Sequence, residues 1–108
     1  MWKDSDDLLI YADENNLFSS MYPKTCPVCN HKSVHLYLHR FEENDSIGAI
    51  WLWCSNCMSY THAQFRIPNS WNNLATIDEN ALESDPEYLE GIFMDIDDHT
   101  NKIASSTK

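Results

Sequence analysis

The sequence predicts an α+β domain in which acidic helices flank a small three-stranded antiparallel sheet held by two pairs of cysteines. Three observations predict this fold. The pairs Cys26-x2-Cys29 and Cys54-x2-Cys57 are separated by 24 residues. Segments around these pairs alternate apolar and polar side chains with the period of two that is typical of strands. The residues before and after this central part are acidic, and the last third repeats apolar side chains at helical spacing.

The chain of 108 residues has room for one domain. We expect an N-terminal acidic segment (1–23), a cysteine-containing sheet (24–67), an acidic helical segment (68–99) and a disordered tail (100–108). The formal net charge of −10 lies outside the sheet, because one Lys and five acids precede residue 24, and two Lys and nine acids follow residue 67. Such a chain is soluble and suits a basic partner. It suits nucleic acid less well, because phosphate binding depends on Lys and Arg.

The N-terminal segment predicts a short helix over residues 4–17, with Asp4 or Ser5 as its N-cap, although the run LLIY within it also suits a buried strand. The turn-forming segment SSMYPK (19–24) ends this element. The N-terminus lacks the basic and apolar regions of a signal peptide, and no apolar run reaches the ~18 residues of a membrane span. We therefore expect a cytoplasmic protein without membrane contact, in which paired cysteines hold metal rather than form disulfides.

Three segments in the centre of the chain alternate between two faces as strands do. A polar turn, EENDSIG, separates the first segment from the second, and Pro68 ends the third because proline cannot donate to a sheet ladder. The pattern predicts a three-stranded antiparallel meander. Its strands are expected at residues 33–41, 47–53 and 59–67.

A second helix is expected within residues 84–99. Ser84 or Asp85 can serve as its N-cap, with Pro86 at the first helical position. Apolar residues follow at spacings that share one helix face, and Gly91 weakens this helix by about 1 kcal/mol without ending it. The apolar residues are Tyr88, Leu89, Ile92, Phe93 and Ile96.

The two cysteine pairs predict one structural Zn²⁺ ion. Zinc in structural sites prefers four soft ligands in a tetrahedron, and two Cys-x2-Cys pairs on turns can supply them. The 24 residues between the pairs fit two strands and a turn. Four thiolates fill the coordination shell, so that no position remains for a substrate. The predicted ligands are Cys26, Cys29, Cys54 and Cys57.

In these residues the segment Cys26–Ile67, about two fifths of the chain, resembles the zinc-ribbon family, in which two cysteine knuckles pin a small antiparallel sheet. Asn30 stands after the first knuckle, where such knuckles often carry Gly, and Asn tolerates a positive φ. Met58 holds the matching place after the second knuckle and suits it less, which predicts a different turn there. The resemblance implies a fold and a metal rather than an activity, because zinc ribbons serve many functions.

Other readings of the cysteines fit less well. An iron site of the rubredoxin type also uses two Cys-x2-Cys pairs, but with glycine in both knuckles. A redox pair of the thioredoxin type would leave the second pair unexplained. A zinc deaminase needs His-x-Glu upstream and Pro before the Cys-x2-Cys pair, whereas Pro27 follows Cys26 here.

The histidines near the cysteines are not expected to bind the metal. His31 could replace a ligand or bond a cysteine sulfur, but four thiols suffice, so we expect it to be exposed. His35 and His39 lie on one strand face about 13 Å apart, too far to share an ion, and we expect that face to be half-exposed. His62 could approach either of them, depending on the order of the strands.

No Ser/His/Asp constellation, phosphate loop or carboxylate pair is legible, which predicts a non-enzymatic protein without a small-molecule substrate. We expect it to bind another protein, as an acidic inhibitor or immunity protein that masks a basic toxin or nuclease would. The ribbon has more aromatic residues than it can bury alone, so that the terminal segments cover some and the rest can anchor a partner. The predicted contact residues are Glu87, Glu90, Asp95, Asp97 and Asp98, with Trp51 or Trp71 as anchors.

The alternative is a nucleic-acid-associated zinc ribbon, an accessory protein in transcription or translation. It would act through Lys32, Arg40 and Arg66, clustered on one side of the sheet, together with exposed aromatic residues on which bases stack. Salt-sensitive binding to single-stranded RNA or DNA would favour this alternative.

Overall fold

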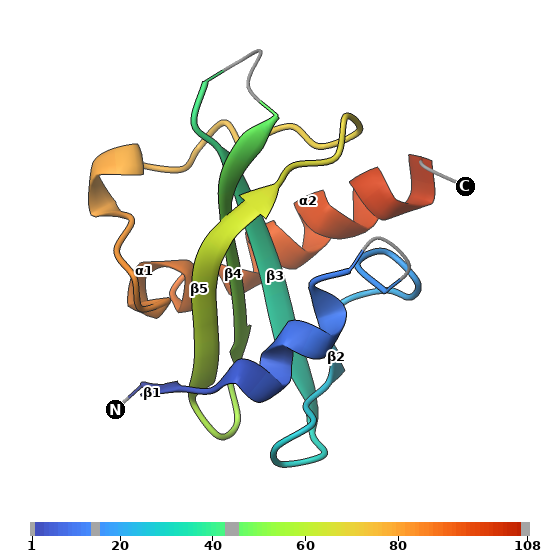
Figure 1. The fold of residues 1–108 in the computed structure, drawn as a ribbon, viewed down its shortest axis with the longest axis vertical. Coiled ribbons are helices and arrows are strands. Elements are labelled where there is room, and N and C mark those ends of the chain that lie inside the picture. Colours follow the sequence, from blue (N-terminus) through green and yellow to red (C-terminus); the bar gives the residue numbers. More distant parts are fainter. Residues whose placement is uncertain (1, 14–15, 43–45, 107–108) are drawn as a thin grey trace.

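The centre of the fold is a five-stranded mixed sheet (Figure 1). The computed structural model describes residues 2–13, 16–42 and 46–106. The strands lie in the order β1-β5-β4-β3-β2, with β1 parallel to β5 and the other pairs antiparallel. The prediction of a three-stranded antiparallel ribbon is therefore wrong. The strands are β1 (Lys3–Asp4), β2 (Lys24–Thr25), β3 (Lys32–Arg40), β4 (Ile47–Cys54) and β5 (Ser59–Arg66).

The two strands that were not predicted are edge strands of two residues each, too short to show any period in the sequence. β1 is held by backbone hydrogen bonds from Lys3 N–H to the Met58 carbonyl and from Ser5 N–H to the Tyr60 carbonyl, both 2.8 Å. β2 pairs with the start of β3, with a register shift between its two residues. The three longer strands lie within one residue of their predicted ends.

Both faces of the central strands are covered. In Figure 1, α2 crosses behind the sheet and the N-terminal 3-10 helix η1 (Asp6–Tyr11) crosses in front of it. Neighbouring residues of β3 point to different covers, and both sets are buried: Leu36 and Tyr37 are each 0% exposed. The prediction that His35 and His39 share a half-exposed face is consequently wrong, because they are 2% and 7% exposed.

Of the helix predicted over residues 4–17, the structure forms the part at Asp6–Tyr11 as the 3-10 helix η1, which includes LLIY; residues 14–15 lie outside the described residues. After β1, Ser5 occupies the N-cap position of η1 without a side-chain hydrogen bond. Single side chains from this segment enter the core, with Leu8 0% and Leu17 2% exposed. The segment contributes apolar cover rather than a regular helical face.

Among the described residues, the chain after β5 contains two short helices and one longer helix. A 3-10 helix η2 (Glu79–Ala81) precedes α1 (Glu87–Glu90). The N-cap of α1 is Pro86 and not the predicted Ser84 or Asp85, because the helix begins one residue later than predicted; Glu87 N–H donates to Asp85 Oδ1 (3.2 Å). Gly91 is the C-cap of α1, and a turn at residues 91–92 separates α1 from α2 (Phe93–Ser106). The prediction of one helix running through Gly91 is therefore wrong.

The prediction of a disordered tail is wrong for residues 100–106, which continue α2; residues 107–108 lie outside the described residues. Thr100 is fully buried, and its hydroxyl donates a hydrogen bond to the Leu36 carbonyl on β3 (3.1 Å). Ile103 and Ala104 are buried one turn further on. None of the described helices is both long and apolar enough to cross a membrane.

Candidate metal centre

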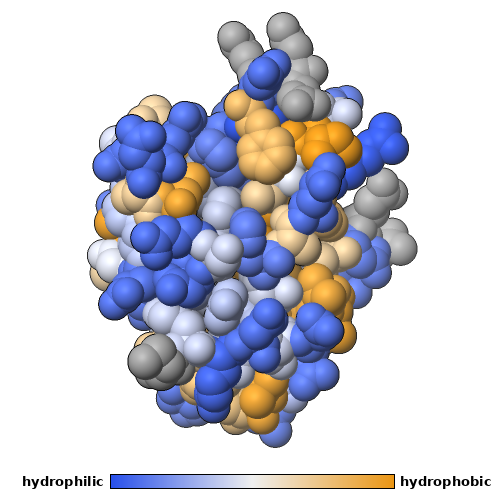
Figure 2. Space-filling model, turned by 60° about the vertical axis from the view of Figure 1, so that its left-hand side comes forward, coloured by the Kyte–Doolittle hydropathy of each residue, from blue (hydrophilic) through white to orange (hydrophobic). Residues whose placement is uncertain are grey.

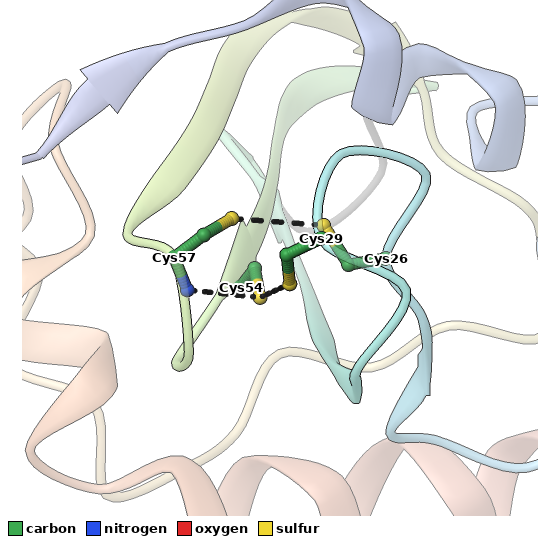
Figure 3. Close-up of side chains that lie close together, drawn as sticks. All are labelled: Cys26, Cys29, Cys54 and Cys57. Carbon is green, nitrogen blue, oxygen red and sulfur yellow. Dashed lines mark hydrogen bonds between the residues drawn. The ribbon is translucent and has the colours of Figure 1, made fainter.

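Two knuckles bring the four cysteines together beside the sheet (Figure 3). Cys26 and Cys29 lie in the turn between β2 and β3, Cys54 ends β4, and Cys57 lies in the turn before β5. The pairing of β3 with β4 places Val34 opposite Cys54, and this register sets the second knuckle beside the first. The four Sγ atoms all lie within 4.8 Å of one another.

The sulfur positions fit a tetrahedral site with four thiolate ligands. The Sγ atoms of Cys26 and Cys57 are 3.7 Å apart, and those of Cys29 and Cys54 are 3.6 Å apart. A tetrahedron with Zn–S bonds of about 2.3 Å has S–S edges of about 3.8 Å. Disulfide bonding would require about 2.05 Å, and all four cysteines are free. The cysteines thus form a possible metal site, as the sequence predicted.

The two knuckles have the same backbone geometry. Asn30 and Met58, each one residue past its knuckle, have φ values of 64° and 61°. Asn30 N–H donates to the Cys26 carbonyl (2.9 Å), and Met58 N–H donates to the Cys54 carbonyl (3.0 Å). The expectation that Met58 imposes a different turn is therefore wrong. The left-handed conformation costs Met58 about 1–2 kcal/mol, which the rest of the knuckle offsets.

Hydrogen-bond donors surround the sulfur atoms. Val28 N–H lies 3.3 Å from Cys26 Sγ, and Asn56 N–H lies 3.3 Å from Cys54 Sγ, at equivalent positions of the two knuckles. The Ser33 hydroxyl is 3.0 Å from Cys54 Sγ. Such donors stabilise thiolates and orient ligands for the metal.

The four thiols differ in acidity when no metal is bound. Burial raises the pKa of Cys26 to about 12 and also raises that of Cys54. The pKa of Cys29 is lowered to about 6, first by the hydrogen bond from the Asn56 side chain to its sulfur (3.4 Å). A bound divalent cation would favour the thiolate form of all four, because coordination requires deprotonated sulfur.

Among the described residues, no histidine joins the cysteine cluster. His31 is exposed. His39 on β3 and His62 on β5 are separated by β4, and both line a pocket over the sheet. Burial lowers the pKa of both, although Glu79 partly offsets this for His39.

A buried polar network lies next to the second knuckle. The Nδ1 atom of His35 is 2.8 Å from both carboxylate oxygens of Asp97 on α2, and its Nε2 atom is 2.7 Å from Ser55 Oγ. The Ser55 hydroxyl donates to Glu90 Oε1 on α1 (2.6 Å), which also accepts the indole N–H of Trp53 (3.0 Å). The network thus joins β3, β4, the second knuckle, α1 and α2.

Asp97, His35 and Ser55 are connected in the order of a hydrolase triad, but the proton of the serine is directed elsewhere. A hydroxyl has one proton, and Ser55 donates it to Glu90 rather than to His35. His35 is also 2% exposed. The arrangement therefore fastens the helices to the sheet. The sequence does not reveal this network, because Ser55 and Asp97 are 20 and 62 positions from His35.

The predicted contact residues divide into exposed and internal groups. Glu87, Asp95 and Asp98 are exposed, whereas Glu90 and Asp97 point into the network described above. Both predicted anchors are core residues: Trp51 is 4% and Trp71 is 1% exposed. The terminal segments cover these indoles, so neither can serve as an exposed anchor.

The cations of the alternative prediction do not cluster. Lys32 begins β3 beside the first knuckle, whereas Arg66 ends β5 opposite Ile47, at the other end of the sheet. The Arg40 guanidinium donates to the carbonyl groups of Pro68 and Trp71, both 2.9 Å, and so holds the chain after β5.

Comparison of the chain with models of protein families, with curated proteins and with solved structures found no match. The likeness to zinc ribbons therefore rests on the two knuckles and on the three long strands between and beside them.

Proposed function

We propose that this protein is not an enzyme, is stabilised by one Zn²⁺ ion and binds a basic protein, as an inhibitor or immunity protein does. The spacing of the four sulfur atoms carries the metal part of this proposal, because edges of 3.6 and 3.7 Å suit Zn²⁺. A tetrathiolate shell leaves no open position for a substrate. The ion is accordingly structural and stabilises the surface that binds the partner.

The charge of the C-terminal segment supports a basic partner. Nine acids follow residue 67, and six of them are exposed. Among the described residues 68–106, Lys102 is the one Lys or Arg. On the side that carries α1 the surface is mostly hydrophilic, with hydrophobic side chains in separate patches (Figure 2). The exposed acids are Asp78, Glu79, Glu83, Glu87, Asp95 and Asp98.

Native mass spectrometry of the protein purified from its source cells without chelator tests both the bound metal and the basic partner. One Zn²⁺ per chain together with a co-purifying basic protein is the expected result. A chain without metal despite four reduced cysteines would contradict the structural role of zinc. A co-purifying nucleic acid would favour the alternative of a nucleic-acid-associated protein.

Charge reversal then locates the contact. The triple change Glu87→Lys, Asp95→Lys and Asp98→Lys should weaken binding to the co-purified partner strongly at low salt and little at high salt. The matched control is Asp4→Lys, Asp6→Lys and Asp7→Lys, because these three acids are also exposed and their reversal changes the net charge equally. Equal loss in both variants would show a general charge effect, and no loss in either would contradict the acidic contact.

A further inference from the structure

A pocket of about 580 Å³ lies between the sheet and the segment 79–84. Residues of β3, β4 and β5 form its floor, and the segment is held above them by a hydrogen bond from Trp51 Nε1–H to the Glu83 carbonyl (2.8 Å). Its volume falls in the range of about 300–1,000 Å³ that is usual for ligand sites. We call it the Trp51 pocket. The lining residues that matter below are His39, Phe41, Trp51, His62, Glu79 and Glu83.

The Trp51 pocket has aromatic walls. The rings of Trp51 and His62 are 4.5 Å apart between centroids and inclined by 30°, so that they form a nearly stacked pair. Phe41, which lines the same pocket, leaves 58% of its surface exposed. Aromatic faces of this kind attract planar cations and stack on them.

The charges of the Trp51 pocket are negative. Glu79 and Glu83 are exposed acids, and none of the described residues that line the pocket is Lys or Arg. Glu79 Oε1 lies 3.5 Å from His39 Nε2. Burial lowers the pKa of His39 and of His62, which favours the neutral form of both rings beside the two carboxylates.

We propose that the Trp51 pocket receives an arginine side chain of the basic partner. Two carboxylates can accept hydrogen bonds from the guanidinium, and its plane can stack against the ring of Phe41 or of His62. This inference rests on the proposed function and names the chemistry by which the partner is recognised. A neutral side chain of the same shape would keep N–H donors but would lose the charge attraction to the two carboxylates.

The test uses the zinc-loaded full chain, labelled with ¹⁵N, and three capped peptides of one sequence that contain arginine, citrulline or lysine at a single position. Citrulline has the shape of arginine without the charge. We expect the arginine peptide to shift the Trp51 indole N–H resonance and to bind at least tenfold more tightly than the citrulline peptide, and more tightly than the lysine peptide. The double change Glu79→Gln and Glu83→Gln should weaken arginine binding about tenfold.

The control is Asp4→Asn with Asp6→Asn, which removes two exposed negative charges that do not line the pocket. Retention of arginine binding in this control supports the assignment. Equal binding of the arginine and citrulline peptides, equal loss in both variants, or an unmoved Trp51 resonance would overturn it. If the arginine peptide fails while the co-purified partner still binds, the proposed function stands and the pocket has no part in it.

Discussion

The carboxylate of Asp97 on α2 accepts the Nδ1–H of His35 on β3, with 2.8 Å between the nitrogen and each carboxylate oxygen. The His35 side chain is 3% exposed and that of Asp97 is 14% exposed. The contact therefore connects the last helix to the middle of the sheet in surroundings that water barely reaches.

Replacement of Asp97 tests this connection. Asp97→Asn should lower the free energy of unfolding by about 2 kcal/mol, because hydrogen bonds to charged groups contribute about 1.5–3 kcal/mol. The neighbour Asp98 is the control: its side chain is 69% exposed and pairs with Lys102 across 3.2 Å. Asp98→Asn should change stability by less than about 0.5 kcal/mol. Urea unfolding of the two zinc-saturated variants measures both free energies of unfolding. An effect of Asp97→Asn as small as that of Asp98→Asn would show that the buried contact contributes nothing to stability.

Substitution of a metal ligand and substitution of a group that bonds a ligand should lower the Zn²⁺ affinity to different extents. Loss of a group that hydrogen-bonds a metal ligand typically costs about 10–100-fold in metal affinity, and we expect Ser33→Ala to fall in this range because it removes the hydroxyl 3.0 Å from Cys54 Sγ. Cys54→Ser removes a ligand and should weaken Zn²⁺ binding further than Ser33→Ala does. Competition with a chromophoric chelator gives both affinities. Unchanged zinc affinity in Cys54→Ser would exclude the four-cysteine site.

Asn30 tests the geometry of the knuckle. Its φ of 64° is in the left-handed region, where a residue with Cβ is strained and glycine is not. Asn30→Gly should therefore retain or slightly raise the unfolding free energy, whereas Asn30→Ala should lower it by about 1 kcal/mol. The side chain is exposed, so loss of packing does not complicate the comparison. Thermal unfolding of the zinc-loaded forms distinguishes the two, and equal stability would contradict the positive φ.

His39 and His62 should make the folded protein less stable as the pH falls. Because the pKa values of His39 and His62 lie below the usual 6.5, the unfolded chain binds more protons than the folded one between those values and 6.5. The free energy of unfolding should fall as the pH falls through this interval, and the effect is absent above it.

Urea titrations at about pH 7.5 and about pH 5.5 measure the decrease. Zinc binding also weakens with acid as thiolates become protonated, so the parent protein alone does not isolate the histidines. His39→Gln and His62→Gln should each lose less stability than the parent over the same interval. Identical losses in all three proteins would assign the whole decrease to the metal site.

The three buried tryptophans differ in their hydrogen bonds. Trp51 and Trp53 donate to the Glu83 carbonyl and to Glu90 Oε1, whereas the Trp71 indole nitrogen has no hydrogen-bond partner among the described residues. Trp53→Phe should therefore cost about 1–3 kcal/mol more than Trp71→Phe, since it leaves a charged acceptor with one donor fewer. Chemical denaturation of the two variants checks this difference. A larger loss of stability in Trp71→Phe than in Trp53→Phe would mean that the lost packing outweighs the lost hydrogen bond.

The central strands and the cysteine cluster could be predicted because their signals are local. Alternation along β3, β4 and β5 and the two Cys-x2-Cys pairs each lie within a few residues. β1 and β2 could not be predicted, because two-residue strands exist only through their partners. The break falls at Gly91, whose weak helix propensity was visible in the sequence, but a cost of about 1 kcal/mol does not by itself predict that a helix ends.

Side-chain roles at long range could not be predicted either. Asp97 lies on the polar face of its helix in sequence, and only the packing of α2 on β3 turns it toward His35. Trp51 and Trp71 were expected to anchor a partner because the ribbon alone cannot bury them, but the segments after β5 cover them. In both cases the deciding contact joins residues far apart in the chain.

The edge strand β1 depends on residues next to the metal site. The backbone N–H groups of Lys3 and Ser5 donate to the carbonyl groups of Met58 and Tyr60, which lie one and three residues past Cys57. Loss of a bound ion would loosen the second knuckle and these acceptors with it, so that β1 would lose its pairing with β5. The metal would thus decide whether the sheet has four strands or five.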